Sequence, residues 1–352
     1  MPVKLASSLV TLLLLACTKT EPASVSDESA KPPRARPAGS TASGATVLAH
    51  DPSFQLPAAE RIVAIGDLHG DVSALRAALR LGGAIDAAGK WVGGTLVVVQ
   101  TGDQLDRGDD EPQILELLTR LRGEAQAAGG AVHVLNGNHE VMNVQADFRY
   151  VTADGFHDFS AGHPDALHVQ LSANAQPEQR GRTAAFLPGG EVARRLAIQP
   201  VVLQIGSNVF VHGGVLEPHL RYGLARINQE TSAWMAGAPT GPAPVSVSND
   251  RAPIWVRDYS DGTPAPERCA ELARVLTALS AHRMVVGHTV QQEGISNACD
   301  GKVWRIDVGL SRFYGGKPSV LEIRGEQVRA LTEATDPAGG ATNPSTAPSS
   351  RP

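Results

Sequence analysis

The chain has 352 residues and a formal net charge of −5 at pH 7, with 42% hydrophobic and 19% charged residues. This length and apolar fraction allow a sizeable core, arranged as one large domain or two ordinary ones. The mildly acidic balance and the lack of lysine or arginine runs argue against a nucleic-acid-binding protein.

The first 17 residues have the pattern of an export signal. Lys4 supplies a positive charge, and the apolar run at residues 5–15 is too short to span a bilayer as a mature helix. The run ends in Leu-Leu-Ala-Cys17, which resembles a bacterial lipobox, where cleavage leaves a lipid-modified cysteine at the new N-terminus. The alternative is an ordinary secretory signal with an incidental cysteine. We expect a lipoprotein signal at residues 1–17, because Cys17 directly follows the small residue that closes the run.

Two flanking stretches have compositions that do not build a core. Residues 18–57 and 333–352 are rich in Ser, Pro, Ala and Thr, and we interpret them as a flexible tether and a disordered tail. Residues 58–332 remain as one folded domain. The resemblance to lipoproteins implies anchoring on the periplasmic side of the outer membrane, because Thr18 is not the aspartate that usually retains such proteins at the inner membrane.

Within this domain, apolar runs rich in β-branched residues repeatedly lead into polar loops. Strands are predicted at residues 61–65, 95–100, 131–135, 201–205, 209–211, 283–286, 303–306, 319–323 and 327–331. Helices are predicted at residues 72–81 and 112–121. Because open α/β sheets place their chemistry at the carboxyl ends of strands, the loops that follow the strands are the candidate site.

Five of these loops carry side chains that suit metal ligation. The candidate ligands are Asp67, His69, Asp103, Asn138, His212 and His288. A mixed set of carboxylate and imidazole donors suits zinc, iron or manganese. Six such ligands, with one carboxylate able to bridge, indicate two metal ions rather than one. A single Asp before a helix is usually an N-cap, as we expect for Asp71, but five loops together favour a metal site.

The order of the motifs resembles that of the calcineurin-like metallophosphoesterases. The motifs are Gly-Asp-x-His-Gly from Gly66, Gly-Asp-x-x-Asp-Arg-Gly from Gly102, Gly-Asn-His-Glu from Gly137, His-Gly-Gly from His212 and Gly-His from Gly287. The Asp-Arg-Gly ending resembles the phosphoprotein phosphatase branch. Within that branch the chain resembles the bacterial Shewanella-like protein phosphatases, with supporting stretches at residues 138–143, 188–190, 253–257 and 304–309. The resemblance covers residues 58–332 and implies an α/β (α+β) fold, a metallophosphoesterase β-sandwich of two mixed sheets flanked by helices.

The resemblance also implies a role for each candidate ligand. Asp67 and His69 would hold the first of two divalent metal ions, and Asp103 would bridge both. Asn138, His212 and His288 would hold the second ion. Manganese is favoured over iron and zinc.

Further residues would act on the substrate. A metal-bridging hydroxide would attack phosphorus while His139, oriented by Asp106, protonates the leaving oxygen. Arg107 and Arg257 would bind the phosphate, Arg257 on the strength of a short Trp-x-Arg motif. The alternatives are a third imidazole ligand for His139 and a surface charge for Arg107. Tyr314, beside two glycines, either overhangs the active site or serves packing.

The remaining cysteines, Cys269 and Cys299, form an even pair in a chain with an export signal. Because disulfides persist outside the cytoplasm, we expect a disulfide between them. The alternative is two buried free thiols.

Three functions fit these motifs. The first is a monomeric protein phosphatase that acts on phosphoproteins or small phosphomonoesters. The second is a nucleotide or diadenosine polyphosphate hydrolase, for which we find no dedicated base-binding motif. The third is a non-catalytic phospho-ligand binding module, which is disfavoured because every expected catalytic residue is present. Many relatives have Gly-His-x-His where this chain has Gly287-His-Thr-Val, and this departure favours the phosphoprotein phosphatase branch.

Overall fold

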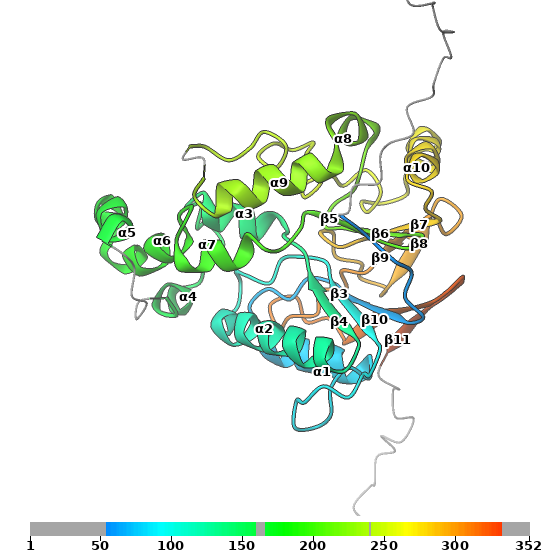
Figure 1. Cartoon of the computed structure of the whole chain (residues 1–352), viewed down its shortest axis with the longest axis horizontal. Helices are drawn as coiled ribbons and strands as arrows, with labels where there is room; N and C mark the ends of the chain where they lie inside the picture. The colour runs from blue at the N-terminus through cyan, green and yellow to red at the C-terminus, as the bar shows by residue number, and fades with distance from the viewer. Residues whose placement is uncertain (1–53, 160–165, 239–240, 333–352) are drawn as a thin grey trace, which may run out of the picture. The chain divides into compact units, whose positions relative to one another are not determined.

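The computed structural model describes residues 54–159, 166–238 and 241–332. The predicted signal with Cys17, nearly all of the tether and the predicted tail therefore lie outside the described residues. The described part contains two β-sheets with helices packed on their outer faces (Figure 1). Among these helices, none is both long enough and apolar enough to cross a membrane.

The first sheet has five strands in the order β11-β10-β2-β3-β4. Its strands are β2 (Ile62–Ile65), β3 (Val97–Gln100), β4 (Ala131–Val134), β10 (Ser319–Arg324) and β11 (Gln327–Thr332). The neighbours β2, β3 and β4 are parallel, whereas β10 pairs antiparallel with both β2 and β11. The carboxyl ends of the three parallel strands consequently lie at one edge of the sheet.

The second sheet has six strands in the order β1-β5-β6-β7-β9-β8. Its strands are β1 (Gln55–Leu56), β5 (Val202–Ile205), β6 (Asn208–Val211), β7 (Arg283–Val286), β8 (Ser296–Ala298) and β9 (Val303–Arg305). The predicted hairpin forms between β5 and β6, with Ile205 paired to Asn208 around a two-residue turn in which Gly206 has φ 55°. The strands β6, β7 and β9 are parallel neighbours.

Both sheets are mixed, and their inner faces share one apolar layer. Ile62, Ala64 and Val99 of the first sheet belong to the same buried cluster as Leu203, Phe210 and Val285 of the second. Because side chains alternate along a strand, Val63 and Ile65 belong instead to a cluster on the outer face. The predicted sandwich of two mixed sheets flanked by helices is confirmed.

Helices cover both outer faces. The first sheet packs against α1 (Val72–Leu81) and α2 (Glu111–Ala127), and the second shares its outer cluster with α8 (Glu217–Tyr222), α9 (Leu224–Met235) and α10 (Pro266–Ala278). Helix α1 has the predicted bounds and is capped by Asp71, which accepts the N–H groups of Ser73 and Ala74. Helix α2 continues beyond the predicted residue 121, because Ala125 extends its buried stripe.

The segment between Asn143 and Pro188, which looked irregular in sequence, is partly helical. After α3 (Asn138–Val144), its described part contains α4, α5, two short 3₁₀ helices and α6, and α7 follows. The helices span Ala153–His157, Ala166–Leu171, Ser172–Asn174, Pro177–Gln179, Arg180–Phe186 and Glu191–Leu196. These helices are too short for a sustained 3.6-residue periodicity, so the sequence pattern did not reveal them.

Candidate metal centre and active site

The loops that follow strands of both sheets meet at one place. Two candidate ligands follow β2, one follows β3, one begins α3 after β4, and one each follows β6 and β7. They are Asp67, His69, Asp103, Asn138, His212 and His288, all with exposed fractions of 7% or less. The structure therefore brings together side chains that are up to 221 residues apart in sequence.

The carboxylate of Asp103 is the centre of this cluster. Its Oδ2 atom lies 3.2 Å from Nε2 of His212, 3.9 Å from Nε2 of His69 and 3.7 Å from Nε2 of His139. Two groups of side chains could hold a metal ion, His69–Asp103–His139 and Asp103–His212–His288. Because Asp103 belongs to both groups, its carboxylate is placed where a bridging ligand would be.

Asp67 and Asn138 complete the two sides. The Asp67 carboxylate lies 3.9 Å from Nε2 of His69 and accepts the backbone N–H of His288 at 3.2 Å. On the other side, Oδ1 of Asn138 lies 3.0 Å from Nε2 of His212, which is 3.1 Å from Nδ1 of His288. Oxygen and nitrogen donors thus surround both sides of Asp103.

Three of the histidines are oriented by backbone carbonyls. Each donates one ring N–H to a carbonyl oxygen, which orients the ring so that the other nitrogen faces the cluster. The pairs are His69 Nδ1 with Leu105 at 3.1 Å, His212 Nδ1 with Thr101 at 3.0 Å and His288 Nε2 with Trp255 at 3.2 Å. Metal-binding histidines are held in this way.

The electrostatics of the cluster also suit cations. Burial and the neighbouring His139 lower the pKa of His69 to about 3, so its free nitrogen keeps a lone pair for a metal ion. Burial alone lowers the pKa of His212, but Asp103 and Asp67 outweigh it and raise this pKa to about 10. Among the described residues, neither carboxylate has an ion pair with lysine or arginine. The raised pKa shows that this cluster of carboxylates favours positive charge. Its oxygen and nitrogen donors therefore fit divalent metal ions.

Several site residues have strained backbone conformations. Positive φ angles occur at His69 (44°), Asp103 (56°), Asp106 (68°), Arg107 (68°) and His288 (68°). Such left-handed conformations are uncommon for residues other than glycine, and they cluster at functional sites where the surrounding fold enforces them. All five of these residues belong to the candidate site.

Glu140 ties two of the loops together. Its carboxylate accepts backbone N–H groups from Gly137 at 2.7 Å and from Asp103 and Gln104 at 2.8 Å each. Burial and the nearby Asp103 raise the pKa of Glu140 to about 7. The sequence motif contains this residue, but its role became visible only in the structure.

His139 and Asp106 form a close pair beside the cluster. Nδ1 of His139 lies 2.5 Å from Oδ2 of Asp106, and Nε2 faces Asp103. Burial lowers the pKa of His139, but Asp103 and Asp106 outweigh it and raise the pKa above its ordinary value. The ring is therefore oriented by one carboxylate while its second nitrogen points to the reaction site.

The two predicted phosphate-binding arginines lie at the rim. The guanidinium of Arg107 is enclosed by the rings of Tyr150, Phe313 and Tyr314, at 4.8, 5.3 and 5.1 Å from the ring centroids. One of its nitrogens donates to the Tyr314 hydroxyl, whereas its buried Nε has no partner among the described residues. Arg257 donates to the carbonyl of His288 at 2.7 Å.

Two aromatic residues are thus added to the site. Tyr314 overhangs it, one of the two alternatives that the sequence left open, and its ring lies 5.5 Å from that of His69. Tyr150, whose ring lies 5.1 Å from that of His139, was missed because no motif surrounds it.

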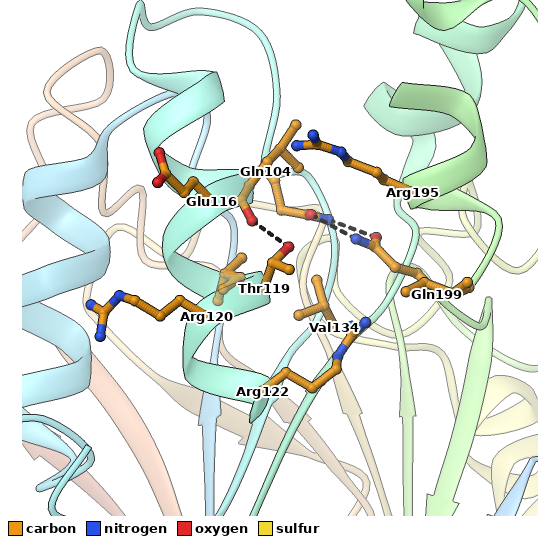
Figure 2. Close-up of a pocket in the computed structure, with 11 residues that line it drawn as sticks. Gln104, Glu116, Thr119, Arg120, Arg122, Val134, Arg195 and Gln199 are labelled. Atoms are coloured by element: carbon orange, nitrogen blue, oxygen red, sulfur yellow. Dashed lines mark hydrogen bonds between the residues drawn. The ribbon is translucent and has the colours of Figure 1, made fainter. Parts of the chain in front are cut away.

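A separate cavity of about 390 Å³ lies beside α2, near the end of α7 (Figure 2). Arg120, Arg122 and Arg195 surround it, and Gln104 and Gln199 exchange hydrogen bonds at 3.2 Å. None of the candidate metal ligands lines this cavity. The site described above is therefore distinct from it.

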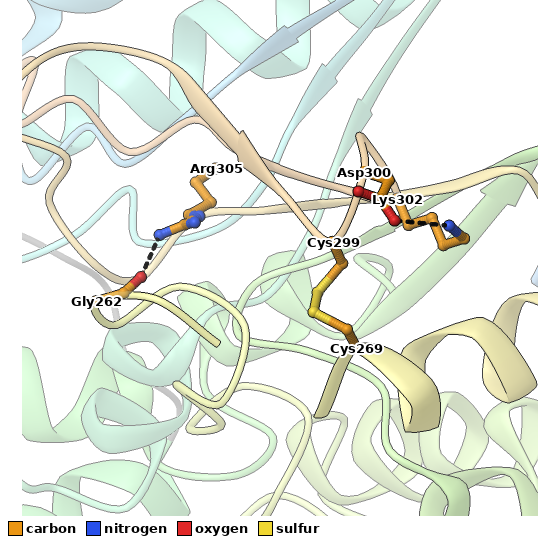
Figure 3. The surroundings of a disulfide bond; sticks show 6 residues. All are labelled: Gly262, Cys269, Cys299, Asp300, Lys302 and Arg305. Carbon is orange, nitrogen blue, oxygen red and sulfur yellow. Dashed lines mark hydrogen bonds and ion pairs between the residues drawn. A yellow bond between two sulfur atoms is a disulfide. The ribbon is translucent and has the colours of Figure 1, made fainter. Parts of the chain in front are cut away.

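Cys269 and Cys299 are joined by a disulfide with a Cα–Cα distance of 5.2 Å (Figure 3). The bond connects α10 to the turn that follows β8. Near it, Asp300 forms an ion pair with Lys302 at 3.9 Å. The disulfide therefore fastens a helix of the outer layer to the edge of the second sheet.

Comparison with known proteins identifies the class of protein. Residues 60–292 match the family model of the calcineurin-like phosphoesterases. The chain is a metal-dependent phosphatase, a hydrolase that acts on phosphoric ester bonds. It belongs to the calcineurin-like phosphoesterase family, and the resemblance seen in its motifs is confirmed. The family uses divalent metals, which agrees with the buried histidine and aspartate groups.

Individual relatives refine this placement. The chain is 39% identical over 310 residues to Shewanella-like protein phosphatase 2 of Arabidopsis thaliana, covering 79% of this chain and 78% of that protein. It is 30% identical over 285 residues to Shewanella-like protein phosphatase 1 of Plasmodium berghei, covering 77% and 74%. The crystal structure of a cold-active protein-tyrosine phosphatase of a psychrophilic Shewanella superposes with a TM-score of 0.62 at 23% identity, covering 79% of this chain and 82% of that one. This last likeness shows the fold.

Proposed function

We propose that this protein removes phosphate from phosphoproteins or small phosphomonoesters with the help of two divalent metal ions. The observation that carries the proposal is the position of Asp103 between two histidine groups, with the His139–Asp106 pair and Arg107 at the same place. The relatives that are named protein phosphatases support the phosphoprotein substrate.

The metal ligands would be divided about Asp103. Asp67 and His69 would hold one ion, Asn138, His212 and His288 the other, and Asp103 both. We favour manganese over iron or zinc, because carboxylate and amide oxygens are prominent among the donors. When bound, two such ions supply Lewis acidity and a water of lowered pKa for attack on phosphorus.

The arginines would bind and orient the phosphate. Arg107 is fixed by the bond from one terminal nitrogen to Tyr314, and its guanidinium would bind the phosphate oxygens. The surrounding rings restrict the guanidinium, which lowers the entropy lost on binding. Arg257 is fixed by its bond to the His288 carbonyl and would approach the phosphate from the other side.

His139 would deliver the proton that the leaving oxygen needs. Asp106 holds Nδ1, so the opposite nitrogen carries the proton toward the cleaved ester bond. His139 could instead be a third imidazole ligand, and substitution of His139 distinguishes the two roles. Loss of a ligand would reduce the metal content, whereas loss of a general acid would slow the hydrolysis of esters with poor leaving groups most.

A substrate panel tests the proposed function. Phosphopeptides with phosphoserine, phosphothreonine and phosphotyrosine are assayed beside p-nitrophenyl phosphate and diadenosine tetraphosphate, with and without manganese. We expect manganese-dependent turnover, with higher kcat/KM for phosphopeptides than for the dinucleotide. Preferential hydrolysis of diadenosine tetraphosphate would contradict the protein phosphatase assignment. The absence of turnover with every substrate would contradict the proposed catalytic function.

We further propose that the protein is an exported, monomeric lipoprotein on the periplasmic side of the outer membrane. The sequence up to Cys17 supports this proposal. A flexible tether of about forty residues has an r.m.s. reach of about 35 Å, from roughly 5–6 Å × √n. The catalytic domain would then act at a distance from the membrane surface.

A further inference from the structure

Arg182, in helix α6, is a buried charge to which the sequence gave no role. Its side chain is fully buried, although a guanidinium stays charged at any physiological pH. Burying such a charge is costly unless its hydrogen bonds and counter-charges are complete. A residue of this kind in a segment without recognisable motifs calls for a specific set of partners.

All five N–H groups of Arg182 have partners. One carboxylate, that of Glu111, receives bonds from both terminal nitrogens. The remaining bonds run from Nε to Oδ1 of Asn143 at 2.8 Å, from Nη1 to the carbonyl of Gly155 at 2.9 Å and from Nη2 to Oδ1 of Asp106 at 3.3 Å. The guanidinium is thus a rigid, five-point connection between separate parts of the fold.

Aromatic rings close the environment of this guanidinium. The centroids of Phe186, Phe159 and Phe148 lie 4.7, 5.1 and 5.9 Å from its central carbon. All three rings, like Arg182 itself, come from the segment between Asn143 and Pro188. Apolar surroundings of this kind strengthen the polar interactions inside and restrict their geometry.

The partners of Arg182 hold Asp106 in place. Oδ2 of Asp106 contacts Nδ1 of His139, while Oδ1 accepts from Nδ2 of Asn143 at 2.9 Å and from Arg182. The backbone N–H of Asp106 donates to Glu111 at 2.5 Å. Because Arg182 bonds to Oδ1 of Asn143, that amide must direct its Nδ2 toward Asp106. Arg182 thereby acts on Asp106 directly, through Asn143 and through Glu111.

We propose that Arg182 is a positioning residue for His139, which acts through Asp106 and Asn143. Helix α6 would then be part of the catalytic machinery, because it carries the group that orients the general acid. Without the guanidinium, the buried carboxylates of Asp106 and Glu111 lose their shared counter-charge and Asn143 loses its fixed orientation. This inference rests on the proposed role of His139.

The leaving group distinguishes positioning from a merely structural role. We compare Arg182→Gln, Arg182→Lys and the matched control Arg180→Gln, which changes an exposed arginine on the same helix. The kcat for phenyl phosphate, whose leaving group needs a proton, is divided by the kcat for p-nitrophenyl phosphate. Both values come from the same preparation, so the ratio does not depend on the fraction of folded enzyme.

We expect Arg182→Gln to lower kcat by about 10²-fold on phenyl phosphate and by about tenfold or less on p-nitrophenyl phosphate, with KM little changed. Arg182→Lys keeps the positive charge but loses the planar set of N–H donors, so its kcat ratio should be intermediate. Arg180→Gln should have the wild-type kcat ratio. If the glutamine variant does not fold, the lysine variant carries the test. A wild-type ratio in the folded Arg182 variants would overturn the proposal.

A second readout does not require turnover. The ring N–H proton of His139 that faces Asp106 is followed by proton NMR and assigned by its loss in Asp106→Asn. We expect this resonance to shift or disappear in Arg182→Gln and to persist in Arg180→Gln. An unchanged resonance in Arg182→Gln would overturn the positioning role, whether or not the wild type hydrolyses phosphate esters. A wild type that hydrolyses no phosphate ester would contradict the proposed function alone.

Discussion

Oδ2 of Asp103 lies 3.2 Å from Nε2 of His212, and these two residues belong to loops of different sheets. Asp103 follows β3 of the five-stranded sheet, whereas His212 follows β6 of the six-stranded sheet. The candidate metal centre is therefore complete only when the two sheets are packed together. Metal binding and the folding of the sandwich are coupled for this reason.

This coupling predicts that metal removal destabilises the fold. A ligand at 100 times its Kd stabilises the native state by about 2.7 kcal/mol per site. We expect a chelator to lower the melting temperature measured by calorimetry, and manganese to restore it. A melting temperature that stays the same after elemental analysis has shown that the metal is removed would contradict this coupling.

The pair of His139 and Asp106 predicts a leaving-group effect. His139→Ala should lower kcat by about 10²–10⁴-fold for a poor alkoxide leaving group, because a general acid contributes a factor of this size. The loss should be smaller for p-nitrophenol, which departs without a proton. Equal losses on both substrates, together with a reduced metal content, would assign His139 to the metal ligands.

The disulfide predicts a stability effect without a catalytic one. Cys269 and Cys299 are 30 residues apart, and a bond that closes such a loop contributes about 2–4 kcal/mol. The double variant Cys269→Ser with Cys299→Ser should lose this amount in urea unfolding and keep its kcat. Mass spectrometry that finds both thiols free in protein from the periplasm would refute the bond.

The proposed lipobox predicts membrane attachment through Cys17. Multiple acyl chains anchor a protein stably, whereas one chain binds marginally. Wild-type protein should pellet with membranes and partition into detergent, and Cys17→Ser should not. A wild-type protein that is already in the supernatant, or that incorporates no labelled fatty acid, would show that residues 1–17 are an ordinary signal peptide.

The sequence predicted the elements whose patterns are local. Helix α1 begins and ends at the predicted residues because Asp71 caps it and its buried positions keep a helical spacing. The strands β1 and β8 were missed, since two or three residues carry no measurable alternation. Strand β1 pairs with β5, which the chain reaches much later, and β8 pairs only with β9, the strand that follows it.

The candidate site was predictable to the extent that it lies in strand-end motifs. All six proposed ligands are near one another in the structure, because the parallel strands of each sheet end at one edge and the two sheets pack together. Tyr150 and Arg182 were not predictable in the same way, since they come from a segment without motifs and reach the site only through tertiary packing. Likewise, nothing in the local sequence indicates the positive φ of His69 or Asp103.

The most direct test of the two-metal assignment is the metal content of Asp103→Asn. The substitution removes the charge that both ions would share, and Asp86→Asn, which changes an aspartate outside the cluster, is the control. Measured by elemental analysis beside kcat, the variant should lose one or more equivalents of metal and keep about 1% of the activity or less, a loss of about 2.7 kcal/mol or more in transition-state stabilisation. Unchanged metal content with normal turnover would contradict a centre built around Asp103.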